Sequence, residues 1–289
     1  MKREEAMKLT QQGLAELNEA IRQGKSETLQ RYLDVLARFH QYSFNNALLI
    51  AIQFPEATRV AGFRMWKKLG RFVKKGETGI GIIAPMVFRK KDGDSGASNA
   101  NDGRQAEPHL GFKVVHVFDV SQTEGEELPE FAQITGDPGE YLNRLEQVIR
   151  DAEIELVYED PGHGAEGVSK KGTIVVMPDL VPAKSFAVLA HEFAHELVHQ
   201  CKSRKDRPSK TVRETEAEAV AHVVCRAIGI DSTTHCADYI QLYRGDVDTL
   251  AESLDVIQKT AGDILTRLGH STEKETEHGR ESEKGRAYA

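Results

Sequence analysis

The segment AKSFAVLAHEFAHELVHQ, residues 183–200, carries two histidines four positions apart, with a glutamate directly after the first. Residues four apart on a helix share one face, with Cβ atoms about 5–6 Å apart, so His191 and His195 can reach one ion. Glu192 projects about 100° further round, beside the metal rather than on it. There it can take a proton from zinc-bound water, whose pKa the metal lowers to about 7. The spacing therefore predicts a zinc site that carries its own catalytic base.

The apolar residues of this segment recur with the period of an amphipathic helix. They are Phe186, Leu189, Ala190, Phe193, Ala194 and Leu197. Such a helix packs one face on a core, so both histidines are expected on a rigid element. His199 extends the histidine series by one turn, but three points along a helix span too far to share an ion. We expect His199 behind the ligands or at the surface.

A hydrolytic zinc site needs a third protein ligand and an open position for water. The next helical pattern, residues 212–228, offers Glu214, Glu216 and Glu218. Glu214 and Glu218 share one helix face, whereas Glu216 projects from another. The pattern predicts Glu214 as the third ligand. Glu218, one turn on, is predicted to accept a hydrogen bond from a ligand imidazole and to fix its tautomer.

Each part of this pattern also has a purely structural interpretation. The two histidines can form a solvated polar edge, and the three glutamates can form a charged helix face. Cys201 and Cys225 are close in sequence to the predicted ligands, so a thiolate ligand is a further alternative. With Cys236 the cysteines are odd in number and never spaced C-x-x-C, which argues against a disulfide framework and a zinc knuckle. The motif and the carboxylate helix together favour the metal site.

Residues 183–230 resemble the zinc-peptidase domain of the ImmA/IrrE and ArdC proteins, a gluzincin-like group. Its pattern, H-E-x-x-H followed by E-x-x-A on the next helix, falls here on His191, Glu192, His195, Glu214 and Ala217. The resemblance implies a small α+β domain in which a β-hairpin precedes the zinc helix. Residues 167–177, GVSKKGTIVVM, have the Gly and Lys turn and the β-branched run of such a hairpin. An edge strand beside a zinc site can accept an extended polypeptide by main-chain hydrogen bonds.

The composition, 39% hydrophobic and 29% charged over 289 residues, is that of a soluble globular protein long enough for two domains. No apolar run approaches the roughly 20 residues of a membrane span, and the N-terminus lacks the apolar stretch of a signal peptide. We therefore expect a cytoplasmic protein with no membrane partner.

The predicted elements form an α+β protein of two domains. Helices are predicted at residues 1–24, 25–39, 45–54 and 138–152, and strands at residues 58–63, 79–86 and 111–120. The last strand is expected to pair with the one that ends near Phe88. Residues 91–108 are small and polar and predict a mobile loop, and the charged residues 271–289 predict a disordered tail. The domain boundary is predicted after residue 127, with an N-terminal module at 1–127, whose partner its basic residues indicate, and a zinc metallopeptidase domain at 128–270.

Residues 59–76 contain seven basic side chains and no acidic one, in a chain of net charge −7. Such a basic patch predicts an anionic partner. Aromatic rings alternate with the cations, which suits single-stranded DNA because rings stack on unpaired bases while cations follow phosphates. The predicted contacts are Phe63, Arg64, Trp66, Lys67, Lys68, Arg71, Phe72, Lys74 and Lys75. The alternative is that the rings belong to the core and the lysines only solubilise the surface.

Separate blocks in the first 120 residues resemble the N-terminal single-stranded-DNA-binding domain of plasmid antirestriction proteins of the ArdC type. They are YSFNNALLI at 42–50, QFPEAT at 53–58, Gly62-Phe63 with Trp66, VKKGE at 73–77 and IIAP at 82–85. The resemblance implies a plasmid or mobile-element protein that protects incoming DNA from restriction.

The sequence thus predicts a single-stranded-DNA-binding, zinc-dependent metallopeptidase with one Zn²⁺ per chain, acting on a protein met on DNA. Zinc held by His191, His195 and Glu214 would polarise water and a scissile carbonyl, and Glu192 would move the proton. The alternative is a non-enzymatic DNA-binding protein whose zinc is structural. Both need the same ligands, so the sequence does not separate them.

Overall fold

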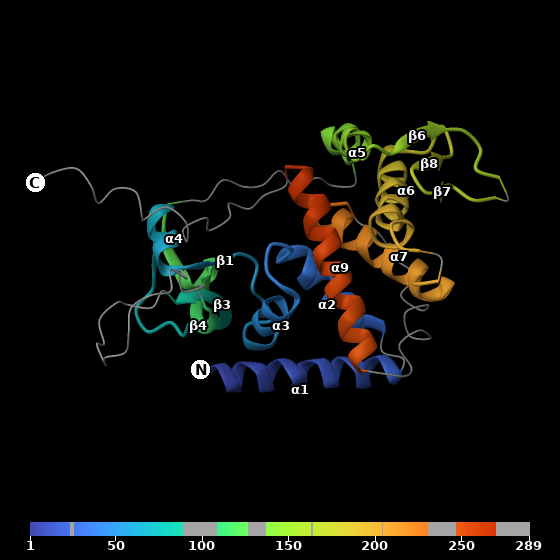
Figure 1. The fold of residues 1–289 in the computed structure, drawn as a ribbon. Coiled ribbons are helices and arrows are strands. Elements are labelled where there is room, and N and C mark those ends of the chain that lie inside the picture. The colour runs from blue at the N-terminus through green and yellow to red at the C-terminus, as the bar shows by residue number, and fades with distance from the viewer. Residues whose placement is uncertain are drawn as a thin grey trace, which may run out of the picture.

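The computed structural model describes residues 1–23, 26–88, 109–126, 137–162, 164–203, 205–230 and 247–269. Helices form the centre of the molecule, with a sheet from the N-terminal half on one side and a sheet from the C-terminal half on the other (Figure 1). The fold is mixed α and β, as expected. The predicted loop at 91–108, the predicted tail at 271–289 and the domain boundary after residue 127 lie outside the described residues, and the two-domain division stays a prediction.

Three helices open the chain: α1 (Arg3–Arg22), α2 (Ser26–Arg38) and the largely buried α3 (Phe44–Gln53). They confirm the three helices expected before residue 55. In α2 the apolar residues Leu29, Leu33 and Leu36 are fully buried, because their spacing of four and three places them on one face of the helix.

The N-terminal sheet has the strand order β1-β4-β3. The long antiparallel pair of β3 (Ile80–Phe88) and β4 (His109–Asp119) is in the register Ile80↔Val117, and β1 (Val60–Gly62) lies on the other side of β4. This confirms the predicted pairing with the strand near Phe88. Helix α3 is tied to β3 by two side-chain amides: Asn46 exchanges hydrogen bonds of 2.8 Å with the backbone of Ile83, and Gln53 does the same with Gly81 at 2.9 Å.

The basic segment has a structure of its own. It forms the short helix α4 (Phe63–Lys68), which was not predicted, followed by β2 (Arg71–Val73). Strand β2 pairs antiparallel with β5 (Thr123–Gly125), which follows the 3-10 turn η1 (Val120–Gln122). Apart from β1, the basic segment therefore lies outside the three-stranded sheet.

The C-terminal half begins with α5 (Glu140–Asp151), which confirms the helix predicted at 138–152. A second sheet follows in the order β6-β8-β7, with β6 (Glu155–Tyr158) parallel to β8 (Thr173–Val176) and β7 (Gly167–Ser169) antiparallel to it. The predicted hairpin is therefore present as β7–β8.

Helix α6 (Pro182–Ala194) carries the first histidine of the motif and continues without a break into a π-helical turn, η2 (His195–Gln200). It packs against α7 (Lys210–Ala227), and α7 packs in turn against α9 (Val247–Arg267) and α2. One buried hydrophobic cluster joins helices from both halves of the chain. No helix in the described ranges is long and apolar enough to cross a membrane.

Candidate functional site

The three predicted metal ligands come together between α6, η2 and α7. His191 Nε2 and His195 Nε2 are 3.1 Å apart, and Glu214 Oε2 lies 3.4 Å from His195 Nε2 and 3.6 Å from His191 Nε2. A tetrahedral ion with bonds of about 2.1 Å separates its ligand atoms by about 3.4 Å. The donor set and its spacing therefore fit one divalent ion. The Glu214 side chain is 49% exposed, which leaves a side of the site open to solvent.

Glu218 supports the first histidine, as predicted from the helix face that it shares with Glu214. Its Oε2 lies 3.2 Å from His191 Nδ1, which leaves Nε2 to face the ion. Burial disfavours a proton on His191, but hydrogen bonds to Glu214 and Glu218 outweigh it and raise the pKa of His191 to about 9. Hydrogen bonds from His191 and His195 lower the pKa of Glu214 in turn.

Glu192 lies beside the ligand group and is not a member of it. Its side chain is buried, and the backbone N–H of Ser169 on β7 donates a hydrogen bond to it. Burial raises the pKa of Glu192, although the neighbouring histidines oppose this. Gly167 makes this approach feasible, because a Cβ there would lie 2.9 Å from Glu192 Cγ and 2.6 Å from Val188 Cγ1. A carboxylate held in this way is suited to accept a proton from water.

A buried chain of hydrogen bonds behind His195 was not predicted. His199 is fully buried and not at the surface, and its Nδ1 lies 3.0 Å from His195 Nδ1. His199 Nε2 lies 3.0 Å from Glu216 Oε2, and Ser253 Oγ on α9 donates to Glu216 Oε1 at 2.6 Å. Burial lowers the pKa of His199, which favours a neutral ring that accepts from His195 and donates to Glu216. This arrangement orients His195 Nε2 toward the ion.

Glu196 fastens the hairpin to the metal helix. It accepts hydrogen bonds from Ser169 Oγ at 2.6 Å and from the backbone N–H of Gly172 at 2.9 Å. Gln200 donates to the Ser169 carbonyl at 3.3 Å. In the β7–β8 ladder the backbone groups of Gly167 and Ser169 point away from β8. The backbone N–H and C=O of Ser169 already bond to the side chains of Glu192 and Gln200. A polypeptide that added to this edge of β7 would therefore have to hydrogen-bond to the backbone of Gly167.

The cysteines do not complete the ligand set. The group formed among the described residues contains two histidines and a glutamate. Cys225 is buried in α7, and burial raises the pKa of its thiol to about 12. Cys201 donates to the Leu197 carbonyl at 3.2 Å. Cys236 lies outside the described residues.

The structure corrects the role of Trp66 at the predicted DNA interface. Its side chain is fully buried, and its indole N–H donates to the Phe118 carbonyl at 2.9 Å. The ring packs in the core, so it cannot stack on a base, and the alternative interpretation holds for this residue. Phe63 and Phe72 are 56% and 53% exposed. These two rings are available for stacking.

The cations of the patch divide into two kinds. Arg64, Lys67, Lys68 and Lys75 have exposed side chains on and after α4. Arg71 instead donates to Thr123 Oγ1 at 2.8 Å, to the Thr123 carbonyl at 3.1 Å and to the Glu126 carbonyl. Lys74 donates to the Ser121 carbonyl at 2.9 Å. Arg71 and Lys74 therefore also hold β2 against the segment around β5.

One protein-family model matches the N-terminal part of the chain, which contains the basic patch at residues 59–76. Residues 4–118 match the family model of the N-terminal domain of the anti-restriction factor ArdC. This range contains every predicted DNA contact and ends before the metal residues.

A curated relative and two solved structures are also similar. An uncharacterized protein of Bacillus anthracis is 25% identical over an alignment 304 positions long, which covers 90% of this chain. The match spans about half (50%) of that protein's length. The metal-free crystal structure of the antirestriction protein ArdC from plasmid R388 aligns with a TM-score of 0.47 and 18% identity, over 79% of this chain and 86% of that one. Its Mn(II)-bound structure aligns at 0.46 and 20%, over 79% and 85%.

Proposed function

We propose that this protein is an ArdC-like antirestriction protein that holds single-stranded DNA on its N-terminal half and cleaves a polypeptide at a metal centre in its C-terminal half. The family match to residues 4–118 supports the first part. The convergence of His191, His195 and Glu214 at tetrahedral spacing, with Glu192 beside them, carries the second.

A divalent ion in this site, which we propose to be Zn²⁺, would polarise both a water molecule and a scissile carbonyl. Imidazole and carboxylate donors suit zinc, and they also accept manganese or cobalt. His191 and His195 would hold the ion from one continuous helical segment and Glu214 from the next helix. Glu192 accepts the proton of the attacking water and delivers it to the leaving amine. The exposed side of Glu214 leaves room for the substrate.

The N-terminal half supplies DNA affinity in this proposal. Phe63 and Phe72 stack on bases, and the exposed cations of α4 follow the phosphates. Binding DNA raises the local concentration of DNA-bound proteins near the metal centre. A protein that acts on incoming DNA, such as a component of restriction, is therefore the proposed substrate.

The substitution Glu192→Gln tests the enzymatic part. It removes the proton acceptor without removing a ligand, so zinc content and DNA affinity should stay unchanged while peptide cleavage falls about 10²–10⁴-fold. Zinc content is measured by native mass spectrometry, and cleavage by mass spectrometry of peptide products. Glu159→Gln, an exposed site after β6, is the matched control and should leave cleavage unchanged.

Protection of incoming plasmid DNA from restriction decides between the enzyme and the structural-metal alternative. If the Glu192→Gln variant protects as well as the wild type while His195→Ala does not, the metal braces the fold and the peptidase proposal is wrong. If both variants lose protection, and Glu192→Gln keeps its metal, the chemistry at Glu192 is required.

A further inference from the structure

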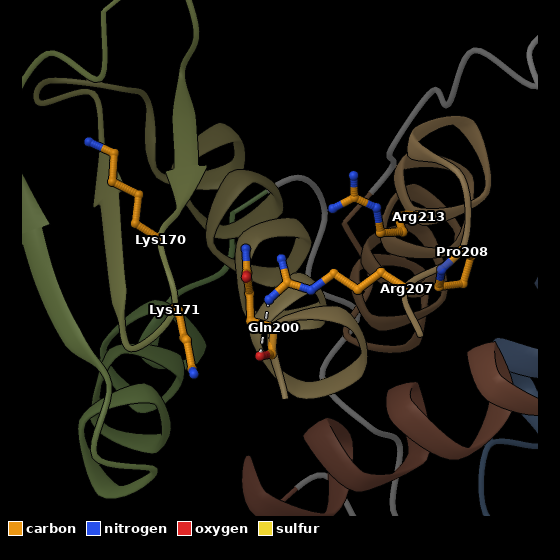
Figure 2. A pocket seen from close by; sticks show the side chains of 6 residues that line it. All are labelled: Lys170, Lys171, Gln200, Arg207, Pro208 and Arg213. Carbon is orange, nitrogen blue, oxygen red and sulfur yellow. Dashed lines mark hydrogen bonds between the residues drawn. The ribbon is translucent and has the colours of Figure 1, made fainter. Parts of the chain in front are cut away.

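A hollow of about 610 Å³ opens between the turn of the β7–β8 hairpin, the end of η2 and the start of α7, and four of the six described side chains that line it are basic. Its lining consists of Lys170, Lys171, Gln200, Arg207, Pro208 and Arg213. Figure 2 shows the two lysines on the side of the β7–β8 hairpin, Arg207 and Arg213 on the opposite side with Pro208, and Gln200 between them. No acidic side chain belongs to the lining among the described residues.

This basic hollow shares η2 and α7 with the metal centre and adds the turn of the β7–β8 hairpin and the segment before α7. Lys170 follows Ser169, whose backbone N–H reaches Glu192. Gln200 is the last residue of η2, which begins at His195, and Arg213 directly precedes the ligand Glu214. The hollow therefore lies between segments that directly adjoin residues of the metal centre in the chain.

Two arginines are arranged for an anion in this hollow. Arg207 is positioned by weak hydrogen bonds from Nη2 to the Gln200 carbonyl at 3.4 Å and from Nε to the Lys202 carbonyl at 3.3 Å, neither of which neutralises its charge. Arg213 Nε is buried and has no hydrogen-bond partner among the described residues. The charge of this guanidinium can pair with a carboxylate that binds in the hollow.

Lys171 occupies a position where its residue type is unfavourable. It has φ +29° and is followed by Gly172 with φ +90° in a two-residue turn. Such turns have φ above zero at both central residues, which is why Asn-Gly is preferred there. A lysine in this conformation lacks a local structural reason, whereas its charge contributes to the hollow. Residues held in unfavourable backbone conformations concentrate at functional sites.

We propose that this hollow binds a carboxylate of the substrate, so that the metal centre acts on acidic stretches of polypeptide. This inference rests on the proposed peptidase function and names the substrate class of that site. Nucleic acid is the less favoured occupant, because the described residues of the lining include no aromatic ring for stacking. In addition, α4 with its exposed cations lies on the opposite side of the molecule from α6, α7 and the hairpin (Figure 1).

Fluorescence anisotropy tests the proposal with the full chain, loaded with zinc and carrying Glu192→Gln so that no peptide is consumed. The probes are a labelled peptide of Gly, Ser and Ala with two adjacent glutamates at its centre, the same peptide with glutamines, and a labelled oligothymidylate. The glutamate peptide should bind about tenfold more tightly than the glutamine peptide, since one charge-assisted contact supplies about that factor. Each peptide is measured with a free C-terminus and as the amide, which separates a side-chain carboxylate from a chain end.

Lys171→Asn is the most informative variant, because asparagine suits the turn and removes only the charge. Lys171→Asn and Arg207→Gln should each weaken the binding of the glutamate peptide about three- to tenfold. Lys8→Gln, which changes an exposed lysine on α1, should leave the affinity for this peptide unchanged. Equal binding of the glutamate and glutamine peptides would overturn the proposal. The proposal would also be overturned if these variants weakened oligothymidylate binding and left the affinity for both peptides unchanged.

The result is separable from the proposed function. If the wild-type chain cleaves peptides without preference for acidic residues, the proposed function stands and the carboxylate site is wrong. If acidic peptides bind in the hollow but no peptide is cleaved, the peptidase function fails and the binding site stands.

Discussion

The hydroxyl of Ser253 is expected to stabilise both the fold and the metal centre, although it is far from the ligands in sequence. Its Oγ donates to Glu216 Oε1 at 2.6 Å, and Ser253 is only 4% exposed. Ser253→Ala leaves one oxygen of a buried carboxylate without its donor. A hydrogen bond to a charged group contributes about 1.5–3 kcal/mol, so the free energy of unfolding should fall by roughly 2 kcal/mol. In a chain of this size that lowers Tm by about 4–8 °C.

The same substitution should weaken metal binding, because Glu216 orients His199 and His199 orients His195. Removing a partner behind a metal ligand lowers metal affinity by about 10–100-fold. A loss near the lower value is expected here, because Ser253 is three hydrogen bonds from His195. The assays are differential scanning fluorimetry of the metal-free chain and competition for zinc with a chromogenic chelator.

A matched control lies on the same helix. Thr266 is exposed, and its hydroxyl donates to the Gly262 carbonyl at 2.7 Å. Thr266→Ala should change the free energy of unfolding by less than about 0.5 kcal/mol and leave metal affinity unchanged. If Ser253→Ala behaves like Thr266→Ala in both assays, the buried chain of hydrogen bonds does not support the metal centre.

Three further outcomes are expected. Replacing Phe63 and Phe72 by alanine should weaken the binding of single-stranded DNA, measured by anisotropy, by about 1–3 kcal/mol per lost stack. Alanine at the exposed Phe112 should leave this affinity unchanged. Equal losses in both cases would show that DNA binds elsewhere. Since the pKa of His191 is about 9 without metal, zinc must displace its proton. Apparent zinc affinity should therefore rise about tenfold per pH unit from pH 6 to 8, and a flat profile would contradict this. Burial disfavours a charge on Asp119. Hydrogen bonds from the backbone N–H groups of Ser121, Arg59 and Thr58 outweigh this effect and lower the pKa of Asp119 below its ordinary value. The charged form therefore stabilises the fold above about pH 4, and this contribution is lost as pH falls through the lowered pKa. Asp119→Asn should cost about 1.5–3 kcal/mol in urea denaturation at pH 7 and much less at pH 3; an equal cost at both would show that the charge is not responsible.

The local parts of the metal centre were predictable because helix geometry alone relates their residues. His191 and His195 are one turn apart, and so are Glu214 and Glu218, so the shared faces follow from spacing. The hairpin was predictable for a similar reason, since its turn and its β-branched strand are adjacent in sequence.

The parts that were missed depend on contacts between distant segments. Ser253 reaches Glu216 only because α9 packs on α7, and no local pattern marks that serine. The π-helical turn that starts at His195 has no signature in the sequence either. Trp66 was assigned to DNA from its basic neighbours, yet whether an aromatic ring faces water or the core is decided by the sheet beneath it.

Helix α7 has a second contact surface. On it, His222 is almost completely buried and lies 2.8 Å from Gln30 and 3.3 Å from Asp34, both on α2, while Glu214 stands at the other end of the helix. A fragment that starts after residue 136 would lack these partners and expose an apolar flank of the helix that carries two carboxylates of the metal centre. Separate expression of the half that carries the candidate metal centre is therefore expected to yield an unstable piece, and point substitutions in the full chain are the safer way to test each proposed role.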